Sequence, residues 1–247
     1  MKSILIFTYT DREKSPFLPI WISYYSKIAN SKLVILYRNE KPNISKDQLD
    51  KVDLINVSHF FNKDNNAKFV PTNDLFIDYQ HEFLLTYDVV IYSDNDEFII
   101  HNNINEILNK DFDQCLVTTG VEIVQNVPYE NPFNFQKKIN DQRKFMVKSA
   151  WYNKPLIVNK KTQWVAGKHN FNKFKNYVDG LYLIHLGKIC LSLSKELIEE
   201  TRILYPQHKF HADFDSHYKN QFNNPNHKDQ PMIEIPIEIK TLIDKIL

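Results

Sequence analysis

The chain has 247 residues, of which 43% are hydrophobic and 13% aromatic, and its formal net charge at pH 7 is +1. This length and composition favour one globular domain with a sizeable core, and the neutral balance disfavours a nucleic-acid-binding protein. No segment has the length of a membrane span, and the two cysteines, Cys115 and Cys190, lie far apart, so we expect a cytoplasmic, reduced protein.

The first hundred residues alternate between short β-branched runs and amphipathic segments. Ser15 and Pro16 have the residue types of an N-cap and a first helical position, and Asn73 is a second expected cap. We expect strands over 2–9, 32–37, 54–57 and 89–92, and helices over 15–28, 45–50 and 73–84. Strands that alternate with helices indicate βαβ units and a mostly parallel sheet flanked by helices.

The pattern changes after residue 100. A short helix is expected over 104–108 and a strand over 115–124, followed by an irregular stretch from about 126 to 153. Long irregular segments in compact domains are usually binding loops. Two further strands are expected, over 155–158 and 181–186.

The most informative feature is the acidic motif that follows the apolar run Val89–Tyr92, where Asp94, Asp96 and Glu97 fall within four positions. At the carboxyl end of a buried parallel strand such acids emerge into the crevice where α/β proteins bind ligands. If strand alternation continues, Asp94 and Asp96 lie on one side, about 6 to 7 Å apart. Two carboxylates so placed can share Mg²⁺ or Mn²⁺, and substrate phosphates complete the shell. The alternative is a turn with solvated acids.

The positions of the glycines and of the charged residues restrict further the kind of ligand that the chain could bind. The four glycines all lie between 120 and 187, so neither a dinucleotide fingerprint nor a P-loop can be present. From 142 to 178 there is no acid, yet nine bases occur. A basic segment that faces an acidic, metal-binding strand suits a ligand with both phosphates and a metal; the alternative is a solvated basic loop. The bases are Arg143, Lys144, Lys148, Lys154, Lys160, Lys161, Lys168, Lys173 and Lys175.

Six motifs follow one another along the chain: Phe17–Tyr25, Tyr79-Gln80, Tyr92–Phe98, Lys154-Pro155, Ala166–His169 and Ile184–Leu186. In this order they resemble glycosyltransferases of the GT-A fold, nearest to the family 2-like and family 92-like enzymes with an Asp-x-Asp-Glu-Phe motif. The resemblance covers most of residues 4–190.

The resemblance implies one GT-A domain over 1–247, with a nucleotide-binding half (1–100), an acceptor and catalytic half (101–190) and a C-terminal helical and extended segment (191–247). It implies transfer of a sugar from a nucleotide-diphosphate sugar to a glycan, a lipid-linked glycan or another hydroxyl acceptor. Mn²⁺ or Mg²⁺ would assist, and inversion is expected because families 2 and 92 are inverting. Contact with a membrane surface stays open.

The same resemblance assigns residues. Asp94, Asp96 and His185 are the expected metal ligands; the alternative for His185, at the end of an apolar strand, is a core histidine. The expected contacts to the nucleotide sugar are Thr8, Tyr9, Thr10, Asp94, Lys154, Lys168 and Trp164.

Three residues are candidates for the general base or an acceptor contact: His169, Asp213 and Glu122. A strand glutamate such as Glu122 is otherwise a solvated residue, and Trp164 is otherwise a core residue. A second cluster has the composition of a metal site but a spacing that arises readily by chance; its members are His208, His211, Asp213, Asp215 and His217.

Two rival functions remain from the sequence. A nucleotide-sugar or carbohydrate-binding protein could keep the fold without catalysis, because Ile20 and Tyr25 depart from the family's opening helix. A phosphatase of the Asp-x-Asp type is disfavoured, because its nucleophile follows the first strand of the fold, whereas this motif follows a later one.

Overall fold

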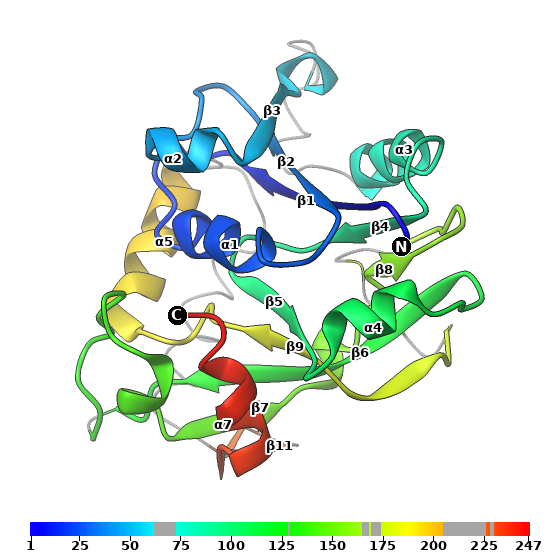
Figure 1. Ribbon diagram of the computed structural model, residues 1–247. Coiled ribbons are helices and arrows are strands. Elements are labelled where there is room, and N and C mark those ends of the chain that lie inside the picture. Colours follow the sequence, from blue (N-terminus) through cyan, green and yellow to red (C-terminus); the bar gives the residue numbers. More distant parts are fainter. Residues whose placement is uncertain (62–72, 128, 165–167, 169–173, 205–225, 228–229) are drawn as a thin grey trace.

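The computed structural model of the chain describes residues 1–61, 73–127, 129–164, 168, 174–204, 226–227 and 230–247 (Figure 1). Ten of the described strands form one sheet, in which the path runs β12-β7-β6-β8-β4-β1-β2-β3. A side branch joins β5 to β9 and β9 to β6. The predicted α/β class, with a central sheet flanked by helices, is confirmed.

The first half of the sheet is parallel, as predicted. It contains β1 (Ile4–Thr10), β2 (Ser31–Tyr37), β3 (Val52–Asn56) and β4 (Val89–Tyr92). The apolar runs of β1 and β4 are buried on both faces because helices cover the sheet. The connecting segments contain α1 (Leu18–Tyr25), α2 (Lys46–Leu49), the 3₁₀ turn η1 (Ser58–Phe60) and α3 (Asn73–Phe83).

Helix α1 begins later than the sequence indicates. Its N-cap is Phe17 rather than Ser15, and Pro19 rather than Pro16 lies in its first turn. Phe17 and Leu18 are both buried, so packing fixes the start of this helix in place of a side-chain cap. Tyr24 and Tyr25 then contact Phe98 of β5, with ring centroids 5.6 and 6.3 Å away.

The second half of the sheet contains both parallel and antiparallel strand pairs. It contains β5 (Glu97–Ile100), β6 (Cys115–Val124), β7 (Phe145–Lys148), β8 (Ile157–Val158), β9 (Tyr177–His185) and β12 (Ile233–Glu234). Strand β8 is antiparallel to β4 and β6, whereas β9 is antiparallel to β5 and parallel to β6. A separate two-strand ladder joins β10 (Asn226–His227) and β11 (Gln230–Pro231).

The stretch expected to be irregular, from about 126 to 153, contains β7 and the 3₁₀ turns η2 (Ile139–Asp141) and η3 (Ala150–Tyr152). The other helices are α4 (Ile104–Asn109), α5 (Leu191–Leu204) and α7 (Ile237–Ile243). None of the helices in the described part of the chain is long and apolar enough to span a membrane.

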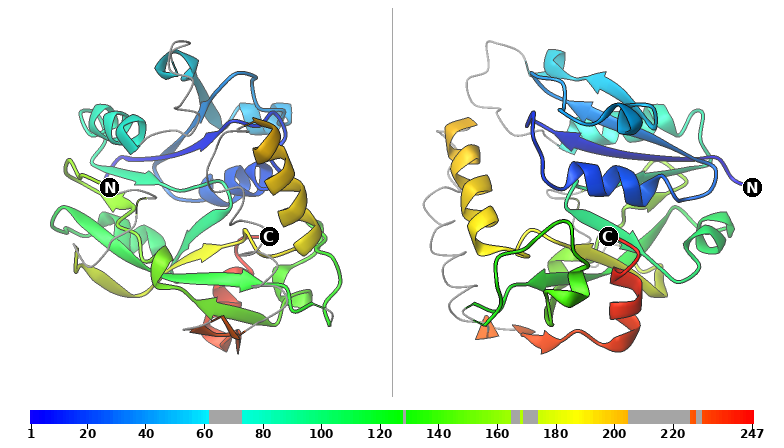
Figure 2. Two further views of the ribbon diagram at one scale, coloured as in Figure 1. Left: turned by 180° about the vertical axis from the view of Figure 1, so that it is seen from behind. Right: turned by 60° about the vertical axis from the view of Figure 1, so that its left-hand side comes forward.

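Helix α5 stands at the end of the molecule toward which the parallel strands point (Figure 2). Arg12, just beyond β1, fixes it there: its guanidinium donates to the Leu197 carbonyl oxygen at 3.0 Å and to Thr201 Oγ1 at 2.7 Å. The start of α5 is tied back to the turn after β9, because Ser194 Oγ donates to the Gly187 carbonyl oxygen at 2.7 Å. The carboxyl ends of the parallel strands and the end of β9 therefore share one side of the fold.

Candidate functional site

The acidic motif forms a turn rather than a continued strand. Strand β4 ends at Tyr92, and the Glu97 amide donates to the Asp94 carbonyl oxygen at 2.9 Å, which closes a four-residue turn that leads into β5. Strand alternation therefore does not apply between Asp94 and Asp96, and the expectation that they lie side by side for that reason is wrong. The buried Ser93 hydroxyl, 3.0 Å from the Tyr25 hydroxyl, anchors the turn to α1.

Three strands place a row of ionisable side chains next to this turn. His185, the last residue of β9, is registered with Glu97 of β5 on one side and with Glu122 of β6 on the other. Residues paired across neighbouring strands project from the same face of a sheet. Glu97, His185 and Glu122 consequently form one row, although they are far apart in sequence.

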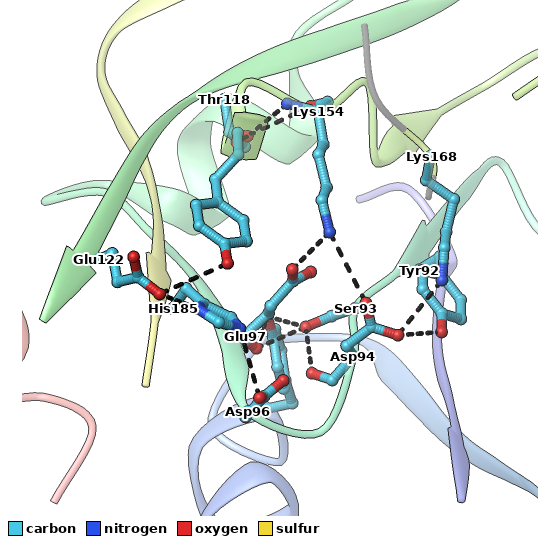
Figure 3. Close-up of polar contacts among 12 residues, drawn as sticks. Tyr92, Ser93, Asp94, Asp96, Glu97, Thr118, Glu122, Lys154, Lys168 and His185 are labelled. Atoms are coloured by element: carbon cyan, nitrogen blue, oxygen red, sulfur yellow. Dashed lines mark hydrogen bonds and ion pairs between the residues drawn. The ribbon is translucent and has the colours of Figure 1, made fainter. Parts of the chain in front are cut away.

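Asp96 and Glu122 hold the two nitrogens of the His185 ring (Figure 3). Asp96 Oδ2 lies 3.3 Å from Nε2, and Glu122 Oε1 lies 3.0 Å from Nδ1. Burial alone would lower the pKa of His185, but the carboxylates of Asp96 and Glu122 raise it to about 10. Without a bound cation, the ring is an imidazolium at neutral pH.

The segment Tyr152–Lys154 covers the row. The Tyr152 ring stacks on the His185 ring with centroids 4.2 Å apart and an interplanar angle of 22°. Asn153 Oδ1 accepts a hydrogen bond from the Gly120 amide at 2.8 Å. A side chain at Gly120 would lie 2.3 Å from the Ser149 carbonyl oxygen and 2.5 Å from Tyr152 Cβ, so only glycine allows this close approach.

Lys154 bridges the turn and the row. Its buried ammonium donates to Glu97 Oε1 and lies 3.6 Å from Asp94 Oδ2. Burial would lower the pKa of Lys154, but the two carboxylates raise it above its usual value, so the group stays charged. Burial raises the pKa of Glu97, and the ammonium of Lys154 opposes that shift.

Lys168 holds Asp94 from the other side. Its ammonium is 3.2 Å from Asp94 Oδ1 and lies over the rings of Tyr92, at 3.8 Å, and Phe76, at 4.3 Å. The Tyr92 hydroxyl donates to the same carboxylate oxygen. Burial would raise the pKa of Asp94, but Lys168, Lys154 and Tyr92 together hold it below its usual value. Asp94 is therefore turned toward cations of the protein.

The site is thus a balanced cluster of four carboxylates and four bases, if His185 carries its proton. The carboxylates belong to Asp94, Asp96, Glu97 and Glu122, and the bases are Lys154, Lys168, His185 and Lys188. Buried charge at a ligand-binding edge of an α/β fold, with strongly perturbed pKa values, is typical of a functional site.

Two of the three expected metal ligands fit a divalent cation. Adjacent ligands of an octahedral ion with bonds of about 2.1 Å are about 3.0 Å apart, close to the 3.3 Å between Asp96 Oδ2 and His185 Nε2. Asp94 does not join them, and the described residues contain no group of three histidine, cysteine or acidic side chains with metal-site spacing. Among the residues that the structure describes, these two side chains could therefore serve as ligands, and substrate oxygens or water would supply the others.

The expected nucleotide contacts in β1 lie beside the turn. Asn95 Nδ2 donates to the Tyr9 carbonyl oxygen at 3.4 Å, and the Tyr9 ring packs against Phe76 with centroids 5.9 Å apart. Thr8 is buried, and its hydroxyl has no hydrogen-bond partner among the residues that the structure describes. The Thr10 hydroxyl is used locally, because it contacts the backbone two residues later.

The other expected site residues are either buried in the protein or lie outside the described part of the chain. Trp164 is buried and donates from Nε1 to the Pro155 carbonyl oxygen at 2.9 Å, as a core tryptophan would. Glu122 is buried rather than solvated, and both of its oxygens have partners. His169 and Asp213 lie outside the described residues, as does the rest of the cluster His208, His211, Asp215 and His217.

Sequence reasoning missed Gly187, Lys188 and Tyr152. A side chain at Gly187 would lie 2.4 Å from His185 Cε1 and 3.3 Å from Asp96 Oδ2, so this glycine leaves room for the pair. A glycine two positions after a strand-end histidine is a signal that could have indicated it. Lys188 and Tyr152 carry no comparable local signal, because both reach Glu122 through tertiary contacts.

Comparison with known proteins finds similarity among solved structures and none at the level of family profiles or curated sequences. No protein family profile and no curated protein matches the sequence. A crystal structure of S. aureus TarS 1-349 is similar at a TM-score of 0.36 and 8% identity, over 90% of this chain and 71% of that one. A crystal structure of S. aureus TarS is similar at 0.35 and 9% identity, over 92% and 44%.

Proposed function

We propose that the chain is a metal-dependent glycosyltransferase of the GT-A type that moves a sugar from a nucleotide-diphosphate sugar to a hydroxyl acceptor, such as a glycan or lipid-linked glycan, with inversion. One observation carries the proposal: the pair Asp96 and His185 lies where β4 and β9 end, in one charge cluster with the buried Lys154 and Lys168. Such a combination suits a diphosphate with its divalent cation.

Each residue has a proposed role. Asp96 Oδ2 and His185 Nε2 would hold Mn²⁺ or Mg²⁺, and imidazole suits Mn²⁺ better than Mg²⁺. When bound, the cation supplies positive charge that stabilises the departing diphosphate. Lys154 and Lys168, which contact Asp94 in this structure, would offer ammonium groups to phosphate oxygens, and Asp94 would face the ribose or a metal-bound water. The general base is proposed to be His169 or Asp213.

Cation binding should be linked to proton release from His185. The ring must be neutral to coordinate, yet its pKa of about 10 leaves it protonated at neutral pH. The Mn²⁺ affinity without nucleotide should therefore rise about tenfold per pH unit between pH 6.5 and 8.5, because one proton competes with the cation throughout this range. Calorimetric titration in buffers of different ionisation enthalpy measures both the Mn²⁺ affinity and the number of protons released on binding. An affinity independent of pH would remove His185 from the metal site.

Turnover tests the function itself. The protein is incubated with Mn²⁺ and each of a panel of nucleotide sugars, and release of the nucleoside diphosphate is followed with and without EDTA. We expect release from at least one donor, abolished by EDTA and accelerated by an acceptor. A donor that stabilises the protein thermally in the presence of Mn²⁺, yet is never cleaved with any acceptor tried, would favour the alternative of a non-catalytic nucleotide-sugar-binding protein.

A further inference from the structure

We infer that Glu122 is a positioning residue: its carboxylate keeps a proton on Nδ1 of His185 and thereby directs Nε2 toward Asp96 and the cation. The inference rests on the proposed metal site, but it assigns Glu122 a role other than the general base that the sequence suggests. It follows from the contacts on the far side of the ring from Asp96.

Both oxygens of Glu122 already have partners inside the protein. Oε1 lies 3.0 Å from His185 Nδ1 and accepts from the Tyr152 hydroxyl at 3.4 Å, while Oε2 accepts from the ammonium of Lys188. The side chain is only 4% exposed. A carboxylate so enclosed is poorly placed to take a proton from an acceptor hydroxyl, which must come within hydrogen-bond reach of a general base.

The same contacts orient the imidazole. Which ring nitrogen of a histidine is free to coordinate depends on the hydrogen bond that the other nitrogen makes. Here Glu122 contacts Nδ1 of the ring and Tyr152 stacks on its face. Gly187 lies so close on the other side that a Cβ built on it would be 2.9 Å from Nε2. The ring can neither flip nor tilt without losing the Glu122 contact, the Tyr152 stack or the space beside Gly187.

Lys188 completes the arrangement. Its ammonium holds Glu122 as a carboxylate, so the group accepts from Nδ1 instead of donating to it. Glu122→Gln keeps the size of the side chain but removes its charge. The glutamine can offer either its carbonyl oxygen or an amide hydrogen to the ring nitrogen, so it no longer selects one tautomer.

The test is Mn²⁺ binding without nucleotide, followed by electron paramagnetic resonance of the free ion, in the wild-type chain and in Glu122→Gln. We expect the affinity to fall about 10- to 100-fold, the usual effect of losing such an outer partner of a ligating histidine. Glu106→Gln, an exposed carboxylate paired with Lys110, is the matched control and should bind as the wild type does.

A spectroscopic readout separates positioning from a general structural role. In the Zn²⁺-loaded wild-type chain, ¹⁵N chemical shifts of His185 should show a protonated Nδ1 and a coordinated Nε2, whereas Glu122→Gln should show a mixture. An Mn²⁺ affinity within threefold of wild type, or a lowered melting temperature as the only change, would overturn the inference. If the wild-type chain itself binds no Mn²⁺, the proposed metal site fails instead.

Discussion

Asp96→Asn is expected to lower the rate of donor cleavage at least about a thousandfold, with Mn²⁺ present at wild-type saturating concentration. The substitution removes the anionic oxygen that lies 3.3 Å from His185 Nε2. A metal that polarises a phosphoryl oxygen contributes several kcal/mol, and about 4 kcal/mol corresponds to roughly a thousandfold in rate. Turnover and Mn²⁺ affinity, measured on the same preparation, check this.

The fold should survive this change, because Asp96 is partly exposed and its backbone contacts are retained. Asp111→Asn alters an equally charged but fully exposed residue and should leave both turnover and Mn²⁺ affinity unchanged. Normal turnover of Asp96→Asn at low Mn²⁺ concentration would show that the cation is not held by this carboxylate.

The largest effect on stability is expected from Lys154→Met, which should lower the free energy of unfolding by about 3 to 5 kcal/mol. Lys154 is buried between Glu97 and Asp94, so its loss leaves Glu97 as a buried carboxylate without a counter-ion. In a protein of this size each kcal/mol shifts the melting temperature by about 2 to 4 °C. Thermal and denaturant unfolding at pH 7 measure the loss.

The pH dependence and a second substitution make this prediction specific. Burial already raises the pKa of Glu97, so in Lys154→Met this carboxyl is protonated more readily in the folded than in the unfolded chain. The destabilisation should be largest at neutral pH and smaller as the pH falls toward about 4.5. Lys154→Met combined with Glu97→Gln should regain part of the lost stability. Lys160→Met, at an exposed pair with Asp113, is the control; an equally small effect at Lys154 would contradict the account.

The parallel half of the fold could be predicted because its signals are local. Each strand is a short apolar run and each helix follows in sequence, so periodicity and βαβ logic suffice for β1 to β4. The start of α1 could not be predicted from local signals, because burial of Phe17 and Leu18 overrides the expected cap at Ser15 and the proline at position 16. Strand β5 was missed because β9, its strand partner in the described part of the chain, lies about 80 residues away.

The part of the site that local sequence signals mark could also be predicted. The acids Asp94 and Asp96 stand out because they follow a buried run, but their geometry was inferred from strand alternation that a turn replaces. The neighbours of the acids come from three separate segments, and no local pattern shows that Lys154 contacts Glu97 or that Glu122 contacts His185. The Glu122–His185 pair depends on the register between β6 and β9, and Lys154 is placed by its backbone contact with Thr118 of β6.

The most direct test of the metal site is the crystal structure of the chain with Mn²⁺ and a nucleoside diphosphate, with data collected at the manganese absorption edge. We predict one anomalous peak within bonding distance, about 2.1 Å, of both Asp96 Oδ2 and His185 Nε2, with diphosphate oxygens in the remaining coordination positions. A manganese peak more than about 8 Å from His185 Nε2, several bond lengths away, would contradict the account.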